Sequence, residues 1–148
     1  MSRAGHCNCG SISVELKEEQ RLSSLVCYWY AQHISSVESK SLIINSRGCS
    51  RAGGGYSVNY VVDDADLDIH DARSTLKTYI DKNTDSGNEV QRLFCGSCGS
   101  PVLTRSPKYP GKGFLKASLF DTMAAPSAEV YTSRREVWQP AIDGAVSR

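Results

Sequence analysis

Four cysteines in two close pairs stand almost a whole chain apart in this sequence. Cys7 and Cys9 form a C-x-C pair near the N-terminus, and Cys95 and Cys98 form a C-x-x-C pair in the last third. A glycine follows each pair and lets the backbone turn, so that both sulfurs of a pair can face one ion. Four thiolates in this pattern are a common tetrahedral ligand set for structural zinc. The two pairs therefore predict one zinc site that holds the N-terminus against the C-terminal third.

Structural disulfides and a redox-active pair are two other interpretations, and the sequence context opposes both. Residues 1–5 contain no apolar stretch that would form a secretory signal, which predicts a cytoplasmic, reducing environment where thiols persist. A thioredoxin-like C-x-x-C belongs to a βαβ unit, whereas residues 100–104 continue as a predicted strand. The sequence context therefore favours metal binding.

The composition excludes several classes of function. Seventeen Lys and Arg stand against 16 Asp and Glu, a formal net charge of +1, which gives no electrostatic basis for nucleic acid or an anionic membrane as the main partner. No apolar run approaches the roughly 20 residues of a membrane-spanning helix. At 148 residues the chain fits one domain, which we place at residues 1–140, with a frayed tail over 141–148.

Short alternating segments predict a mainly β fold. Residues 11–16 alternate apolar and polar side chains with period two, as in a strand with one buried face. Only residues 31–44 have a helical pattern, and it is a weak amphipathic one. The glycine-rich residues 51–56 are expected to form a flexible turn. The prediction is a set of antiparallel sheets with little helix. Further strands are predicted at residues 25–27, 56–62, 67–70, 76–80, 90–94, 102–105, 114–120 and 129–132.

The order of these motifs resembles the glutathione-dependent formaldehyde-activating enzyme family, which includes centromere protein V. Besides the two cysteine pairs, the resemblance rests on Val26 followed by Cys27, on residues 51–54, on Tyr79 and on a late Trp138. It covers nearly all of the chain. It implies a β-tent type fold, in which small antiparallel β-sheets are clamped by the structural zinc.

The resemblance also implies a second zinc ion on a C-H-C-x-x-C segment, with one coordination position left for a thiol or water. An open position of this kind is typical of catalytic zinc. Members of the family are described as carbon-sulfur lyases that add glutathione reversibly to formaldehyde. The resemblance thus implies an enzyme that acts on a thiol/aldehyde adduct, with a thiol such as glutathione and an aldehyde as its partners. The alternative is a noncatalytic, zinc-stabilised binding module.

This chain departs from the family pattern at the second site. Cys27 begins the motif, but the counterpart of the last cysteine, Cys49, lies 22 residues further on, and Ser46 stands where the middle cysteine belongs. Two thiolates and a hydroxyl are a poor ligand set for zinc. We therefore expect Cys27 and Cys49 to be the residual ligands of an incomplete second site, and catalysis to be impaired in this polypeptide.

Residues 29–46 are either a real insertion or a translated intron. The codons of residues 29–31 must read TG-GTAYGCN, which contains an intron start after TG, and an AGY codon for Ser46 would end the intron in AG. Joining TG to the remaining Y restores a cysteine codon and gives the sequence C-Y-C-R-G-C, the family spacing with Tyr in place of His. A surface insertion is the alternative, because the entropy of loop closure grows slowly with length.

Overall fold

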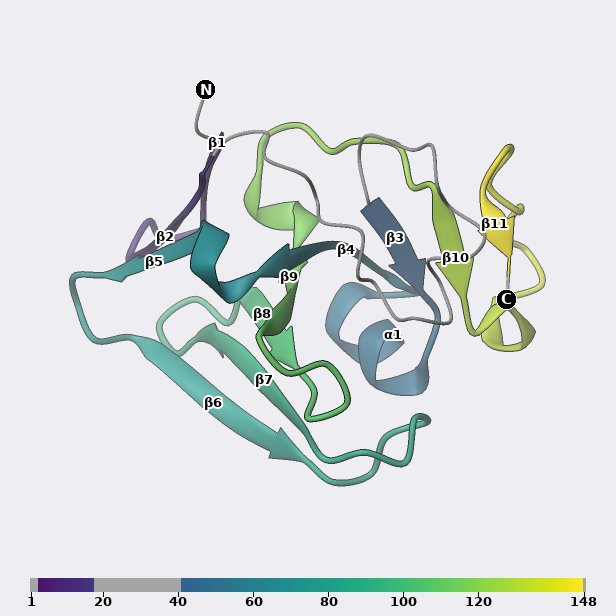
Figure 1. Ribbon diagram of the computed structural model, residues 1–148, viewed down its shortest axis with the longest axis horizontal. Helices are drawn as coiled ribbons and strands as arrows, with labels where there is room; N and C mark the ends of the chain where they lie inside the picture. Colours follow the sequence, from purple (N-terminus) through teal and green to yellow (C-terminus); the bar gives the residue numbers. More distant parts are fainter. Residues whose placement is uncertain (1–2, 18–40, 148) are drawn as a thin grey trace.

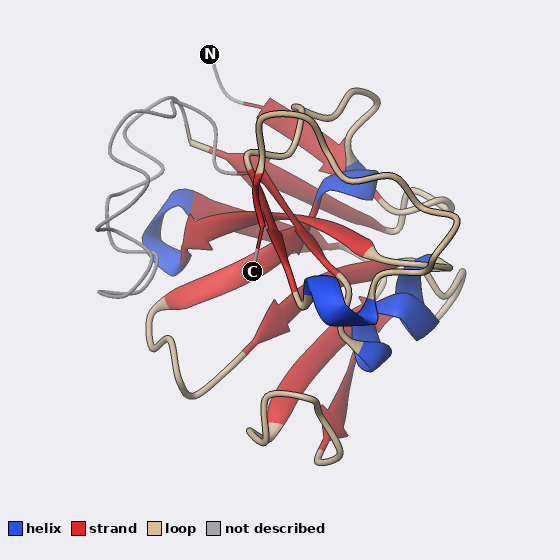
Figure 2. Cartoon of the chain, turned by 90° about the vertical axis from the view of Figure 1, so that its right-hand side faces the viewer, coloured by secondary structure: helices blue, strands red, loops and turns tan. Residues whose placement is uncertain are grey.

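The computed structural model describes residues 3–17 and 41–147 (Figure 1 and Figure 2). The strands are β1 (Arg3–His6), β2 (Ile12–Leu16), β3 (Ser41–Ile44), β4 (Ser57–Asp63), β5 (Leu67–Asp71), β6 (Leu76–Asp81), β7 (Val90–Cys95), β8 (Pro101–Arg105), β9 (Lys112–Lys116), β10 (Ala128–Val130) and β11 (Val146–Ser147). The helices are α1 (Arg47–Gly53) and three short 3-10 segments, Asp64–Asp66, Ala117–Leu119 and Thr132–Arg134. The predicted mainly β fold with little helix is confirmed. No helix in these ranges is long and apolar enough to cross a membrane.

Two sheets divide the strands between them. The small sheet has the order β1-β2-β5, and the large sheet has the order β11-β10-β3-β4-β9-β8-β7-β6. Most neighbours are antiparallel, but β10 pairs in parallel with both β3 and β11. The chain passes from the small sheet to the large one between β5 and β6, and α1 lies beside the large sheet, near β3 and β4 (Figure 1).

One hydrophobic core draws side chains from both sheets. Ile12 and Val14 of β2 are buried in it together with Tyr60, Leu103 and Leu115 of the large sheet. Ile12 and Val14 alternate with less buried neighbours, as period-two patterning predicts. A fully buried aliphatic side chain of this size contributes about 1.5–3 kcal/mol. Burial therefore holds the bodies of the two sheets together.

Most predicted strands have observed counterparts that differ by a few residues at their ends. They are those at 11–16, 56–62, 67–70, 76–80, 90–94, 102–105 and 129–132. The sequence does not predict β1, because Gly5 and His6 interrupt any apolar alternation there. Gly5 is required by packing, since a Cβ at this position would lie 2.7 Å from the carbonyl oxygen of Leu119. The strand predicted at 25–27 lies outside the described residues.

Four local predictions are wrong in whole or in part. Residues 41–44, expected at the end of a weak helix, form β3, because β4 and β10 occupy both of its edges; residues 31–40 lie outside the described ranges. Residues 51–53 belong to α1 instead of a flexible turn. The strand expected over 114–120 ends at Lys116, where a 3-10 segment begins. The tail is not wholly frayed, since β11 pairs with β10.

A buried carboxylate ties β10 to the start of α1. Glu129 is completely buried, and its two oxygens accept hydrogen bonds from Asn45 Nδ2 at 3.0 Å and from Arg135 Nη1 at 2.9 Å. Asn45 lies between β3 and α1 and also donates to the carbonyl oxygen of Val130 at 3.1 Å. The pairing of β3 with β10 and this network together fix the backbone from which α1 begins.

We expect replacement of Arg135 by alanine to lower the free energy of unfolding by about 3 kcal/mol, because the substitution leaves Glu129 charged and buried without its cation. The matched control is Arg134→Ala at the next position. Arg134 pairs with Asp85, and its side chain is 47% exposed, so its loss is expected to cost about 0–1 kcal/mol. Urea unfolding of both variants measures the difference. Equal losses would contradict the role assigned to the buried pair.

Candidate metal centre and adjoining cavity

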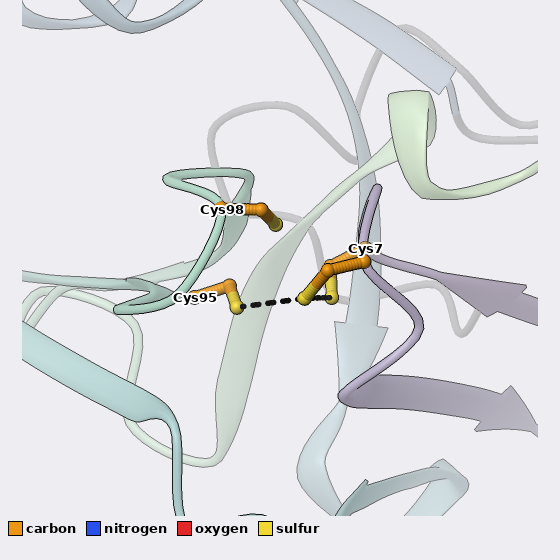
Figure 3. Close-up of side chains that lie close together, drawn as sticks. Cys7, Cys95 and Cys98 are labelled. Atoms are coloured by element: carbon orange, nitrogen blue, oxygen red, sulfur yellow. Dashed lines mark hydrogen bonds between the residues drawn. The ribbon is translucent and has the colours of Figure 1, made fainter.

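The two cysteine pairs meet between the sheets and form one four-cysteine cluster. Cys7 and Cys9 lie between β1 and β2, Cys95 is the last residue of β7, and Cys98 lies in the turn from β7 to β8. Figure 3 shows Cys7, Cys95 and Cys98 close together. All four sulfurs lie within 4.8 Å of one another. The Cys7 and Cys9 sulfurs are 3.6 Å apart, and those of Cys9 and Cys95 are 3.7 Å apart. Zinc-sulfur bonds of about 2.3 Å in a tetrahedron place the sulfurs about 3.8 Å apart. The donor set therefore fits a tetrahedral zinc ion.

The two turns are built alike. The amide of Cys7 donates to the carbonyl oxygen of Ile12 at 2.9 Å, and that of Cys95 donates to the carbonyl oxygen of Ser100 at 2.9 Å. Glycines at positions 10 and 99 follow the second cysteine of each turn with φ of 70° and 76°, a left-handed conformation that glycine adopts without steric cost. The glycines therefore close the turns and direct both sulfurs of each pair to the same side.

Hydroxyl groups stabilise the thiolate form of the outer cysteines. The Ser100 Oγ lies 3.2 Å from the Cys98 sulfur and lowers the pKa of that thiol to about 5. The Ser11 Oγ lies 3.2 Å from the Cys9 sulfur and lowers the pKa of Cys9 in the same way. Burial raises the pKa of Cys7. Because a metal binds the thiolate, these hydroxyl groups favour the form of Cys9 and Cys98 that would bind a metal, whereas burial of Cys7 opposes it.

Of the other two predicted ligands, Cys27 and Cys49, the structure describes only Cys49. Cys49 lies in α1 and is 5% exposed. Cys27 lies outside the described residues. Ser46 is the N-cap residue of α1, but its side chain makes no capping hydrogen bond. Within the described ranges, the groups of three or more potential metal-binding side chains reduce to the four-cysteine cluster, so Cys49 belongs to no such group there.

A cavity of about 470 Å³ lies over the face of β6 to β9 beside α1. Its lining combines apolar side chains of β7 and β8 with three cations, Arg51, Arg92 and Lys116. Gly99 of the lining adjoins the turn that carries Cys98, and the residues contributed by α1 follow Cys49. The cavity thus extends from the helix that carries Cys49 to Gly99, the residue that follows Cys98. The complete lining is Arg51, Ala52, Tyr79, Arg92, Leu93, Phe94, Gly99, Pro101, Leu103, Thr104 and Lys116.

Lys116 is the most unusual group in the cavity. Only 4% of it is exposed, and its ammonium group donates to Ser57 Oγ at 2.9 Å and to Asn59 Oδ1 at 2.8 Å. Burial lowers the pKa of Lys116, the negative charge of a Cys49 thiolate opposes that shift, and the positive charge of Arg92 adds to it. Cys49 and Arg92 are therefore its electrostatic neighbours.

Arg92 lines the cavity and lies against the start of α1. Its Nε donates to Asp81 Oδ2 at 2.7 Å, and a Cβ at Gly48 would overlap its Nη2. Glycine at position 48 therefore lets the guanidinium lie directly against the first turn of α1. The sequence alone predicts a site role for neither Arg92 nor Lys116. The one sequence signal that could have identified Lys116 is its position as a lysine within the largely apolar run 114–120.

Comparisons with known proteins find one matching family model and a similar solved structure. The family model described as glutathione-dependent formaldehyde-activating enzyme matches residues 33–134 of the 148. A crystal structure of a Rhodobacter sphaeroides protein is similar with a TM-score of 0.55 at 14% identity, over 82% of this chain and 90% of that one. At that identity the likeness concerns the fold. No curated protein matches.

Proposed function

Because the chain belongs to the glutathione-dependent formaldehyde-activating enzyme family, we propose that it makes and breaks the carbon-sulfur bond between a thiol and an aldehyde, as a zinc-dependent, lyase-type enzyme. Family membership supports a glutathione-related, formaldehyde-activating function at the family level. The observation that carries the proposal to this chain is the position of Cys49, buried in α1 beside a cavity lined by three cations.

The chemistry of such a site follows from its charges. The thiol gives up its proton, its sulfur attacks the carbonyl carbon, and the carbonyl electron pair moves to oxygen, which is then protonated; the reverse steps cleave the carbon-sulfur bond. Arg92 and Lys116 create a positive potential in the cavity, which favours both the thiolate and the developing alkoxide. A zinc ion held by Cys49 and two further cysteines would supply a Lewis acid that keeps the thiol ionised.

The polypeptide as written does not offer that ligand set. In the family motif, two cysteines separated by one residue come directly before the R-G-C sequence that ends here in Cys49. Ile44 and Ser46 occupy those two positions in this chain. An apolar side chain and a hydroxyl do not replace two thiolates. We propose that this form therefore binds zinc at the four-cysteine cluster, lacks a complete second site, and is impaired in catalysis.

Residues 24–28 are similar in sequence to residues 41–45, which supports the expectation that a chain without residues 29–46 still folds. Residues 24–28 read Ser-Leu-Val-Cys-Tyr, and residues 41–45 read Ser-Leu-Ile-Ile-Asn. In the spliced sequence C-Y-C-R-G-C, residues 24–28 stand at the same distance before Arg47 as residues 41–45 do here. We propose that residues 24–28 take the position of β3 in the shortened chain. Cys27 would then replace Ile44, and the restored cysteine would replace Ser46.

The test is a shortened chain in which residues 29–46 are replaced by one cysteine. The deletion removes β3, a strand with neighbours on both edges, and would unfold the protein unless residues 24–28 replace it. We expect the shortened chain to melt cooperatively, to hold a second zinc, and to accelerate exchange between glutathione, formaldehyde and their adduct in NMR exchange spectra above the rate of the full-length chain.

A matched variant of the shortened chain carries Val26→Asp, which corresponds in position to the buried Ile43 of β3. This variant is expected to unfold. A shortened chain that unfolds without the substitution would contradict the strand replacement and would identify residues 29–46 as a genuine part of the fold. Zinc-stabilised chains of both lengths that bind glutathione without accelerating the exchange would instead assign the alternative, a noncatalytic binding module.

A further inference from the structure

Resting on the proposed function, we infer that Arg51, Arg92 and Lys116 form a carboxylate-binding subsite that makes the cavity selective for an acidic thiol. The proposed chemistry needs only a thiol and an aldehyde. The three cations add a requirement on the rest of the thiol molecule, and they lie in one cavity although they come from α1, β7 and β9.

Lys116 is a buried cation beside the cavity. Its ammonium group is buried, and its hydrogen-bond partners, Ser57 Oγ and Asn59 Oδ1, are neutral. Within the described residues no carboxylate pairs with it. A buried ammonium whose hydrogen-bond partners are neutral is costly, and a cavity opens beside it. An anion that enters this cavity would gain the attraction of Lys116 and would relieve that cost.

Arg51 and Arg92 extend the same positive surface. The Nε of Arg92 is bound to Asp81, which accounts for one negative charge, while Arg51 lies exposed on α1 without an ion pair among the described residues. The lining itself contains no Asp or Glu from the described part of the chain. Three cations and the one carboxylate of Asp81 leave an excess of two positive charges around the cavity.

Glutathione matches this excess in charge. It carries two carboxylates and one ammonium group, so its thiolate form has a net charge of −2. The apolar lining from Leu93, Phe94 and Leu103 can contact its methylene groups, and a cavity of about 470 Å³ is within the range of roughly 300–1,000 Å³ for small-molecule sites. A neutral thiol of similar size would leave the cations unpaired and is expected to bind more weakly.

The probe is ophthalmic acid, the glutathione analogue with a methyl group in place of the thiol, so that binding is measured without sulfur chemistry. Calorimetry on the full-length, zinc-loaded protein is expected to show binding that weakens about tenfold or more when the carboxylates are esterified or when Lys116 is replaced by Met, because a charge-assisted contact is lost. Arg51→Gln, on the exposed surface of α1, is expected to weaken binding less, and Lys82→Gln, an exposed cation outside the cavity, is expected to leave it unchanged.

The outcomes separate this subsite from the proposed function. Ophthalmic acid that binds equally well to the wild type, Lys116→Met and Arg51→Gln would overturn the subsite, even where thiol-aldehyde exchange is accelerated. Binding that is unchanged when both carboxylates of ophthalmic acid are esterified would also overturn it, because the cations would then not be contacting carboxylates. Charge-dependent binding to the full-length chain, together with a shortened chain that does not accelerate exchange, would support the subsite and would count against the enzyme.

Discussion

Replacing Cys95 by alanine is expected to abolish the cooperative thermal unfolding transition. The Cys95 sulfur is fully buried and lies 3.7 Å from that of Cys9, so the substitution removes a donor that joins the turn of the large sheet to the turn of the small sheet. Apparent binding energies of about 10–16 kcal/mol are typical of structural zinc in small domains, whereas whole domains are stable by only about 5–15 kcal/mol. Loss of the metal therefore exceeds what the remaining core supplies.

Circular dichroism melts, with metal analysis of the same sample, measure this effect. The matched control is Cys49→Ala, which truncates a cysteine of similar burial outside the cluster and is expected to cost about 1–2 kcal/mol while the transition remains. A chelator added to the wild type should reproduce the Cys95→Ala result. A Cys95→Ala protein that melts as sharply as Cys49→Ala would show that the core alone stabilises the fold.

Replacing Cys49 by serine in the shortened chain is expected to reduce thiol-aldehyde exchange by about 100-fold or more, because the second zinc loses a thiolate that a hydroxyl does not replace. The fold and the first zinc should be kept, since Cys49 lies in α1 and not in the four-cysteine cluster. NMR exchange rates and zinc content, measured on one preparation, separate the two effects.

The control for this second prediction is Cys9→Ser in the same shortened chain, which removes a ligand of the four-cysteine cluster and should destabilise the fold and activity together. Unchanged exchange after Cys49→Ser would place the chemistry elsewhere. Lost exchange together with lost cooperativity would assign Cys49 a structural role, as a buried side chain of α1, and not a catalytic one.

The elements that can be predicted from the sequence are those determined by neighbours in the chain. The strand β2 is predictable because its own alternation of buried and less buried positions matches the pleat. The strand β3 is not, because its conformation is set by hydrogen bonds to β4 and β10, whose residues lie up to 86 positions away. The helix α1 escapes prediction because Gly48 and Gly53 disfavour a helix that packing against β4 and Arg92 stabilises.

In the candidate site, too, some residues can be predicted from their neighbours in the chain and others depend on distant contacts. The four cysteines of the cluster stand in short motifs whose turns are encoded locally, so their grouping can be predicted from spacing alone. Lys116 cannot be identified in this way, because its burial depends on β9 pairing with β4, which places Asn59 opposite it. The relation of Cys49 to a metal comes only from the family resemblance, and its cavity becomes visible only with the fold.

Native mass spectrometry of the full-length chain, under conditions that retain bound metal, counts the zinc ions that each polypeptide holds. We expect one zinc in the chain as written, lost in the Cys95→Ala variant, and two in the shortened chain. A metal-free folded protein, or two tightly held zinc ions in the full-length chain, would contradict this expectation.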